Sequence, residues 1–375
     1  MRKMITLAVA MAAAAMSLAG CGGTIGAEPS ATAEETETAA PTTAQFVPAT
    51  SGKVTIYTWA DYYPVEELER FKQETGIDYS IDFFDSNETL VAKLEASGNT
   101  GYDVVVPSDY TVEQMIAKGM LLEFDAMSLP NAENIDESTR DPYFDPGRKY
   151  SAPFAYGTTA FAYDTSLLAA GQQGPQTWKE FFAWEGEPYE GHIGVLADVY
   201  ETIVPAMRAQ GAPDCTDDPA YLQGAQDLLM GLKPKINTIS SDAVADRLAT
   251  GENRMAIIWN GDTHRAWEVN DAIEYIYPEE GVSIWSDNWV IPAGAENVDQ
   301  AKTFINWMLD PKNSAEAAEY VGFNTLIKGA FEYLPESMQQ DPAIVPPEGT
   351  KIVEFRSCSN DIVNKYNQIW ETFKQ

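Results

Sequence analysis

Between residues 53 and 119 the chain alternates strand-like and helix-like patterns, and this order limits the folds open to it more than any other feature. In chain order we expect strand 53–59, helix 64–75, strand 77–84, helix 86–97, strand 103–107 and helix 111–118. The third strand contains Val104-Val105-Val106, an apolar run typical of a strand buried on both faces. The alternation predicts an α/β fold with a parallel sheet and helices on both faces.

Aromatic and acidic residues stand together where strands are expected to end, which is where such sheets bind ligands. Three pairs occur: Trp59 with Asp61, Trp259 with Asp262, and Trp285 with Asp287. Aromatic faces attract cations, and carboxylates form charge-assisted hydrogen bonds with ammonium groups. The pairs favour a cleft for a linear organic cation. The alternative is that the tryptophans belong to the core and the aspartates to caps or loops.

The N-terminal residues have the pattern of an export signal. Arg2 and Lys3 precede an apolar stretch, residues 5–20, that is short for a membrane-spanning helix. It ends in Leu18-Ala19-Gly20-Cys21, which resembles the bacterial lipobox. We therefore expect residues 1–20 to be a lipoprotein signal peptide and Cys21 to be acylated. An ordinary secretory signal with a chance cysteine is the alternative.

Residues 21–52 are expected to be the lipidated cysteine and a flexible linker. The stretch is rich in Gly, Ala, Thr, Glu and Pro, so it buries too little apolar surface to offset its ordering entropy. As a random coil it would span about 30 Å. Such a tether would keep a domain close to a membrane.

The length of the chain after the expected linker and its net charge limit the functions that it can have. Residues 53–375 are too many for one small core and suit two domains. The chain has 57 acidic and 24 basic residues, a net charge of −33, which argues against a nucleic-acid partner. A strongly acidic protein attracts cations, although acidity also serves solubility alone.

Cysteines and histidines give no metal-binding pattern. Export would permit a disulfide between Cys215 and Cys358, but the sequence does not show that they are close. The two histidines are His192 and His264, and a structural role for His264 is simpler than a catalytic one beside Asp262. We expect no metal, no cofactor and no catalysis, because no nucleophile motif, P-loop or zinc motif is present.

Several motifs together resemble the periplasmic polyamine-binding proteins, the spermidine- and putrescine-binding components of ABC transporters. In chain order they are Tyr57-Thr58-Trp59-Ala60-Asp61-Tyr62, Asp85-Ser86-Asn87-Glu88-Thr89, Tyr102-Asp103-Val104-Val105-Val106-Pro107-Ser108, Ile257-Ile258-Trp259-Asn260-Gly261, and Trp285-Ser286-Asp287 with Ile291-Pro292-Ala293. The resemblance covers nearly all of residues 53–375. Each motif is modest alone, and their order and spacing carry the resemblance.

The resemblance implies a two-lobe periplasmic-binding-protein fold whose crossing strands act as a hinge. The crossings would fall near residues 156–160, 280–285 and 331–336. Lobe one would comprise residues 53–157 and 285–331, and lobe two residues 158–284 and 332–375. These boundaries come from the resemblance alone.

The same resemblance implies a ligand cleft. Its aromatic and polar wall would comprise Trp59, Tyr62, Ser108, Tyr110, Trp259 and Trp285. The acids facing ligand amines would be Asp198, Glu201, Asp262 and Asp287. Asp61, from the first Trp–Asp pair, would be the fifth acid of the site.

Three positions depart from the family pattern. Ala60 stands where a hydroxyl is usual, and Phe323 where a tyrosine is common. Arg356 stands where spermidine-type members have glutamine. A cation beside a cationic ligand is costly unless paired, so Arg356 could pair with a site acid, shorten the pocket or point to solvent.

The sequence therefore predicts a monomeric, extracytoplasmic binding lipoprotein that captures putrescine or spermidine and delivers it to an ABC permease. It would be anchored to the outer face of the cytoplasmic membrane, or be periplasmic if an outer membrane is present. Two alternatives stay open. One is a receptor of the same fold for a sugar, another amino-compound or ferric iron. The other is an exported two-carboxylate glycosidase.

Overall fold

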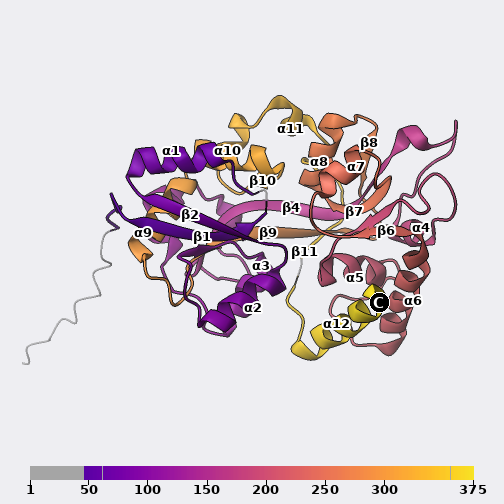
Figure 1. Ribbon diagram of the computed structural model, residues 1–375, viewed down its shortest axis with the longest axis horizontal. Helices are drawn as coiled ribbons and strands as arrows, with labels where there is room; N and C mark the ends of the chain where they lie inside the picture. Colours follow the sequence, from indigo (N-terminus) through magenta and orange to yellow (C-terminus); the bar gives the residue numbers. More distant parts are fainter. Residues whose placement is uncertain (1–45, 61, 355) are drawn as a thin grey trace, which may run out of the picture. The chain divides into compact units, whose positions relative to one another are not determined.

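One mixed β-sheet runs through the part of the chain that the computed structural model describes, residues 46–60, 62–354 and 356–375. Within those residues the main strand order is β2-β1-β3-β9-β4-β7-β5-β6, with β8 and β10 paired to β4 and β11 paired to β9 (Figure 1). Helices cover both sides of the sheet (Figure 1). The predicted α/β class is confirmed.

The alternation that the sequence predicts is present in the first part of the fold. Its elements are β1 (Lys53–Trp59), α1 (Val65–Thr75), β2 (Asp78–Phe84), α2 (Asn87–Ser97), β3 (Val104–Val105) and α3 (Asp109–Ala117). Strand β1 pairs in parallel with both β2 and β3. Local chemistry sets the boundaries: Gly76 ends α1 with φ 75°, and the Ser86 hydroxyl accepts from the Thr89 amide at 3.2 Å to cap α2. We call these elements, with α9 (Val298–Met308) and α10 (Pro311–Val321), the first half.

A second unit lies at the other end of the sheet. Its elements are α4 (Trp178–Ala183), β5 (Ile193–Val195), α5 (Val199–Arg208), α6 (Pro219–Leu232), β6 (Ile236–Ile239), α7 (Val244–Ala249), β7 (Met255–Trp259), α8 (Asn260–Val269), β8 (Ile273–Ile276) and α12 (Asn360–Lys374). Strand β5 pairs in parallel with β6 and β7. We call these elements the second half.

Two long strands connect the halves. Strands β4 (Ser151–Asp164) and β9 (Val282–Val290) pair with each other in antiparallel register, from Ser151 opposite Val290 to Thr159 opposite Ser283. The start of β4 also contacts β10 (Asn324–Thr325), and its end pairs with β7 and β8. The expected crossings near 156–160 and 280–285 fall on these strands. The exact lobe boundaries stay a prediction.

The third expected crossing, near residues 331–336, falls in an irregular connection. It includes a short 3-10 turn, Ala330–Tyr333, and helix α11 (Glu336–Gln340). Strand β11 (Ile352–Glu354) then pairs in parallel with β9 and leads to α12. The structure also answers the question left open on the cysteines, because Cys215 and Cys358 form a disulfide with their Cα atoms 5.3 Å apart.

Most of the N-terminal predictions fall on residues that the structure leaves undescribed, but residues 46–52, the end of the expected flexible linker, are described. The Ala49 amide donates to the Thr303 hydroxyl at 2.8 Å and the Gln300 amide donates to the Ser51 carbonyl at 3.1 Å, so these residues are held against α9. The expected signal peptide, Cys21 and the linker up to residue 45 lie outside the described residues. In the described part of the chain, no helix is both long and apolar enough to cross a membrane.

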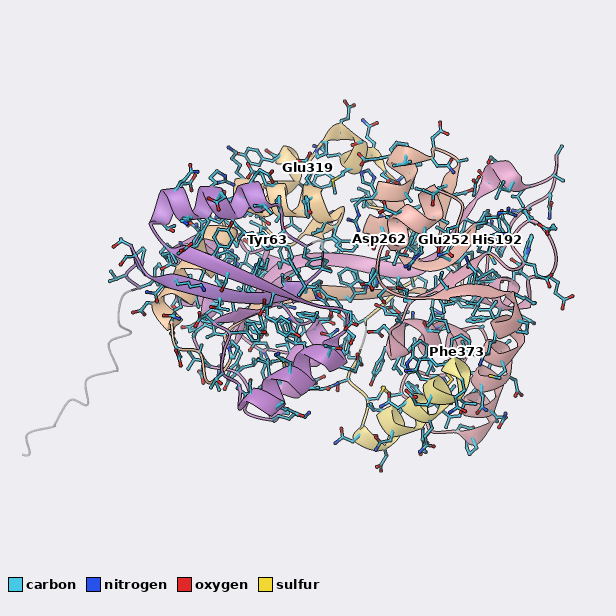
Figure 2. All side chains as sticks on the ribbon, viewed as in Figure 1. Tyr63, His192, Glu252, Asp262, Glu319 and Phe373 are labelled. Atoms are coloured by element: carbon cyan, nitrogen blue, oxygen red, sulfur yellow. A yellow bond between two sulfur atoms is a disulfide. The ribbon has the colours of Figure 1, made fainter. Side chains whose placement is uncertain are left out.

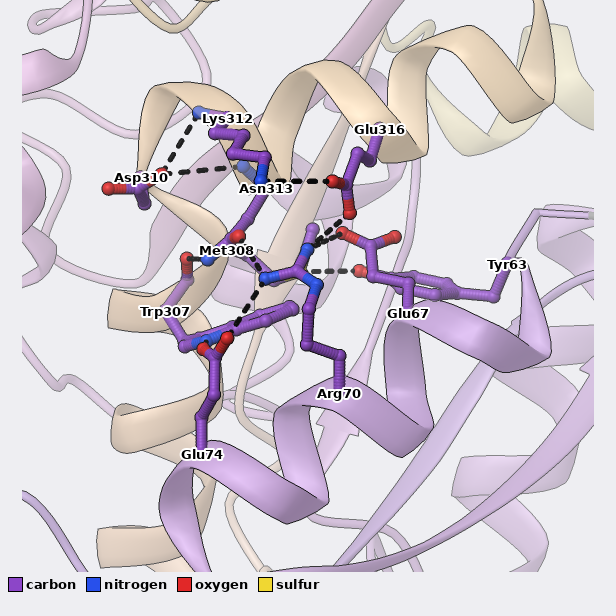
Figure 3. A network of polar contacts seen from close by, with 10 residues as sticks. All are labelled: Tyr63, Glu67, Arg70, Glu74, Trp307, Met308, Asp310, Lys312, Asn313 and Glu316. Carbon is purple, nitrogen blue, oxygen red and sulfur yellow. Dashed lines mark hydrogen bonds and ion pairs between the residues drawn. The ribbon is translucent and has the colours of Figure 1, made fainter.

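A polar network joins α1 to α10 in the first half (Figure 3). Arg70 donates to Asn313 at 2.7 Å, pairs with Glu316 and lies 4.6 Å from the Trp307 ring centroid. Glu67, on the same helix, is 2% exposed, and neither carboxylate oxygen has a hydrogen-bond partner among the described residues. Its nearest base is Arg70, at 3.9 Å. Burial and the nearby Glu316 raise the pKa of Glu67 well above its usual value.

This raised pKa makes Glu67 a pH-dependent cost to stability. A carboxyl whose folded pKa lies above its unfolded pKa stabilises the fold fully only below the unfolded value, and that contribution is lost as pH rises toward the folded pKa. We expect Glu67→Gln to raise the free energy of unfolding at pH 8 by about 1–2 kcal/mol. Urea unfolding at pH 4 and pH 8 measures this, and the gain should shrink at pH 4. Glu66→Gln, on the exposed face of the same helix, is the matched control.

Candidate functional site

A cavity lies between the two halves, beyond the carboxyl ends of β1, β2, β5 and β7. The predicted residues that line it are Trp59, Tyr62, Ser108, Tyr110, Asp198, Glu201, Trp259, Asp262, Trp285 and Asp287, with Ala60 and Phe323 from the departures. Asp61 lies outside the described residues. Figure 2 shows Asp262 where the two halves of the sheet meet. Folding therefore collects residues that stand more than 220 positions apart in the chain, such as Trp59 and Asp287.

Arg356 is not among the residues that line this cavity. Its guanidinium pairs with Glu354 at 2.5 Å and lies 3.7 Å from the ring centroid of Tyr143, and its side chain is half exposed. Of the three alternatives for Arg356, this placement corresponds to the one at the surface. The partner of Arg356, Glu354, does not line the cavity either.

Asp287 is the most enclosed acid of the cavity, with 1% of its surface exposed. The Ser108 hydroxyl donates to one carboxylate oxygen at 2.7 Å, and the Tyr62 hydroxyl donates to the other at 2.6 Å. Asn87 supports this pair, because its amide donates to the Ser108 hydroxyl at 3.1 Å and to the Tyr110 hydroxyl at 2.8 Å. Two hydroxyls thus hold a buried carboxylate with no ion pair to it among the described residues.

Asp198 and Glu201 lie at the start of α5. Asp198 is the N-cap, and its carboxylate accepts from the Glu201 amide at 3.0 Å. Glu201 accepts from the Trp259 indole at 3.2 Å through one oxygen, and its other oxygen has no hydrogen-bond partner among the described residues. Both side chains are buried, at 4% and 8% exposed. Asp198 is therefore a helix cap and a cavity residue at once.

Asp262 differs from the other buried acids of the cavity because Arg265 already forms an ion pair with it. Arg265, one turn later on α8, forms an ion pair with Asp262 and also lines the cavity. His264, between them, points elsewhere: its ring contacts Asp341 at 2.5 Å and it does not line the cavity. This placement gives His264 a structural contact.

The tryptophan rings of the cavity are fixed by the surrounding frame. The Trp59 indole donates to the Val106 carbonyl at 3.0 Å, and the Trp285 indole donates to the Thr159 hydroxyl at 3.0 Å. Phe323 packs edge-on against Trp285, with ring centroids 4.8 Å apart. Because the indole N–H groups of Trp59 and Trp285 are already bonded, these rings offer a ligand mainly their apolar faces.

Two buried acids of the cavity, Asp287 and Glu201, have raised pKa values. Burial raises the pKa of Asp287 to about 7, although the hydroxyls of Tyr62 and Ser108 oppose the shift. Burial and the neighbouring Asp198 raise the pKa of Glu201 to about 8. Each shift reflects negative charge held away from water with too little positive charge nearby.

The side chains that line the cavity carry more negative than positive charge. Among the described residues that line the cavity, one is basic, Arg265, and seven carry carboxylates: Asp85, Asp198, Glu201, Asp242, Asp246, Asp262 and Asp287. A ligand bearing several positive charges would restore the balance, and the flat rings would pack against its apolar segments. In the described part of the chain, no group of three or more His, Cys, Asp or Glu residues could hold a metal ion.

Sequence reasoning missed part of the wall. Asp85 and Asn87 stand in a motif that carried the family resemblance, but they were given no role. Asp242 stands just before α7 and Asp246 within it, and no predicted site residue lies on that helix. No pattern marked them, because only the packing of α7 beside the cavity gives them a role.

Comparisons with known proteins agree with this geometry. Residues 67–346 match the family model described as bacterial extracellular solute-binding protein. The chain is 32% identical to spermidine/putrescine-binding periplasmic protein 1 of Haemophilus influenzae, covering 88% of this chain and 91% of the relative. It is also 32% identical to the spermidine/putrescine-binding periplasmic protein of Escherichia coli K12, covering 85% and 89%.

A solved structure has a similar fold. The structure described as a putative spermidine/putrescine ABC transporter from Listeria monocytogenes has a TM-score of 0.80 and 31% identity to this chain. The match covers 87% of this chain and 99% of that one. The two-lobe architecture expected from the sequence is that of these neighbours.

The burial of Asp287 should affect how the stability of the ligand-free protein depends on pH. Its folded pKa of about 7 lies above the ordinary 3.8, so its favourable contribution is complete below pH 3.8 and is lost as pH rises to about 7. We expect Asp287→Asn to raise the free energy of unfolding at pH 8 by about 1–3 kcal/mol. Denaturant unfolding across pH 4–8 measures the difference. A variant less stable than wild type at pH 8 would contradict this cost.

Proposed function

The chain belongs to the bacterial extracellular solute-binding proteins, and we propose that it captures a polyamine such as putrescine or spermidine and delivers it to an ABC importer. The observation that carries the proposal is the wall of the cavity, where the described residues include seven carboxylates and one guanidinium. In this role the protein binds and transfers its ligand without catalysis.

A linear polycation suits this cavity better than the other solutes considered. Burying Asp198, Glu201 and Asp287 costs free energy unless positive charge compensates them, and a neutral sugar brings none. For ferric iron, the described residues contain no group of three or more His, Cys, Asp or Glu residues that could hold a metal ion. A polyamine supplies ammonium groups for the carboxylates and methylene segments for the faces of Trp59 and Trp285.

Calorimetry of residues 46–375 with putrescine, cadaverine, spermidine and spermine tests the proposal. We expect at least one amine to bind with release of protons at pH 7, because ammonium groups favour the charged forms of carboxylates whose pKa values are about 7 to 8. The observed heat should therefore change with the ionisation enthalpy of the buffer. No heat and no thermal shift with any of the four amines would exclude polyamines.

Two variants locate the binding in the cavity. Asp287→Asn should cost about 2–4 kcal/mol of binding free energy, because it removes the charge from a desolvated ammonium contact. Asp227→Asn, on the exposed face of α6, changes the net charge equally and should leave the dissociation constant unchanged. Equal losses in both variants would indicate a general charge effect.

We also propose that Cys21 is acylated and anchors the protein, as a monomer, to a membrane. The sequence before Cys21 supports the anchor. The disulfide between Cys215 and Cys358 fits an exported protein, because such bonds persist in oxidising compartments. The anchor would keep the binding domain close to the permease.

Metabolic labelling with a fatty-acid analogue tests the anchor in cells that produce the full chain. Wild type should incorporate the label and remain with the membrane fraction. Cys21→Ser should do neither, while Cys215→Ser should still be labelled. Label in the Cys21→Ser protein would show that the acyl group lies elsewhere.

A further inference from the structure

The segment from Arg356 to Ser359, between β11 and α12, contacts both halves of the fold, and we call it the strap. On the side of the first half, the Arg356 guanidinium lies 3.7 Å from the ring centroid of Tyr143. The Gln114 amide of α3 donates to the Ser357 hydroxyl at 3.3 Å. These two contacts connect the strap to the loop before β4 and to α3.

On the side of the second half, the strap is covalently held. Cys358 is bonded to Cys215, in the connection between α5 and α6, across a sequence separation of 143 residues. Before the strap, Glu354 lies opposite Ile284 of β9, and its carboxylate holds the Arg356 guanidinium at 2.5 Å. The anchored end and the contacting end are therefore only two residues apart.

The strap lies beside α5, the helix that carries Glu201 and is capped by Asp198. Cys215, Arg356 and Cys358 line one small hollow together with Tyr200 of α5. The Tyr200 ring also packs against Tyr110, a cavity residue of the first half, with ring centroids 5.3 Å apart. The strap and this ring pair thus join the same two halves at neighbouring places.

The strap depends on its anchor. Arg356 is half exposed, and Ser357 and Ser359 add no apolar side chain that could hold the segment by burial. A cross-link restricts such a segment by reducing the conformations it can adopt when it is released. Without the bond, the strap would be held only at its two ends, where the chain continues into β11 and α12.

We propose that the strap is a latch across the two halves, and that the disulfide between Cys215 and Cys358 is its anchor. The proposal rests on the proposed function, because ligand buried between the halves leaves only when they separate. Separation breaks the contact of Arg356 with Tyr143 and that of Gln114 with Ser357. Because the disulfide holds the strap, Arg356 acts as a positioning residue that slows ligand release. Arg356 itself does not line the cavity.

Ligand-release rates of four proteins test the latch: wild type, Arg356→Ala, the double variant Cys215→Ala/Cys358→Ala, and the triple variant. Stopped-flow measurement uses the amine that binds tightest in calorimetry. We expect Arg356→Ala and the double variant each to release ligand about 5- to 10-fold faster, given the usual strengths of cation–π contacts and hydrogen bonds. The triple variant should be no faster than the double variant, because a free strap has already lost the Arg356 contact.

The matched control is Arg254→Ala, which removes a partly exposed arginine paired with Glu187 in the second half. It should release ligand at the wild-type rate. Unchanged release in the double variant, with a lower melting temperature alone, would overturn the latch and leave the disulfide as a stabilising bond. Effects of Arg356 and the cysteines that multiply in the triple variant would overturn the anchoring role.

A second readout needs no ligand and separates the latch from the proposed function. Small-angle scattering of the ligand-free proteins should give a larger radius of gyration for Arg356→Ala and for the double variant than for wild type. Equal radii would count against the latch. Absence of binding by every amine, with the radii changed as expected, would overturn the polyamine proposal and leave the latch standing.

Discussion

The burial of Asp287 is the constraint on which the rest of the site depends. A carboxylate that is 1% exposed and has only hydroxyl donors around it costs free energy, and its pKa of about 7 expresses that cost. The site is therefore incomplete without positive charge. The hydroxyls of Tyr62 and Ser108 fix where that charge must arrive, since they hold both carboxylate oxygens in place.

The sheet explains why the site around Asp287 is shared by the two halves. Strand β9 carries both Trp285 and Asp287, and it pairs with β4 along the line that joins the halves. Trp259 and Glu201 reach the same cavity from the second half, where they contact each other. A ligand held between these groups would compensate charges on both halves at once. This arrangement links ligand binding to the relative position of the halves.

Much of the first half could be predicted, because its signals are local. Gly76 ends a helix since it tolerates a left-handed backbone, and Ser86 begins one since its hydroxyl reaches an unpaired amide. The three Trp–Asp pairs also followed from short motifs at strand ends, whereas the other candidate residues came from the family resemblance. Asp242, Asp246 and the position of Arg356 could not be predicted. Their roles depend on which helix or loop packs beside them, and no short-range pattern records that.

The sequence by itself determined the α/β alternation, the acidic character and the candidate residues, because periodicity, caps and charge are properties of neighbouring residues. Only the tertiary structure decided that Cys215 meets Cys358 and that Arg356 lies outside the cavity, beside Tyr143. Such outcomes depend on contacts between residues more than a hundred positions apart. Burial, which sets the pKa values of Asp287 and Glu201, exists only once those contacts form.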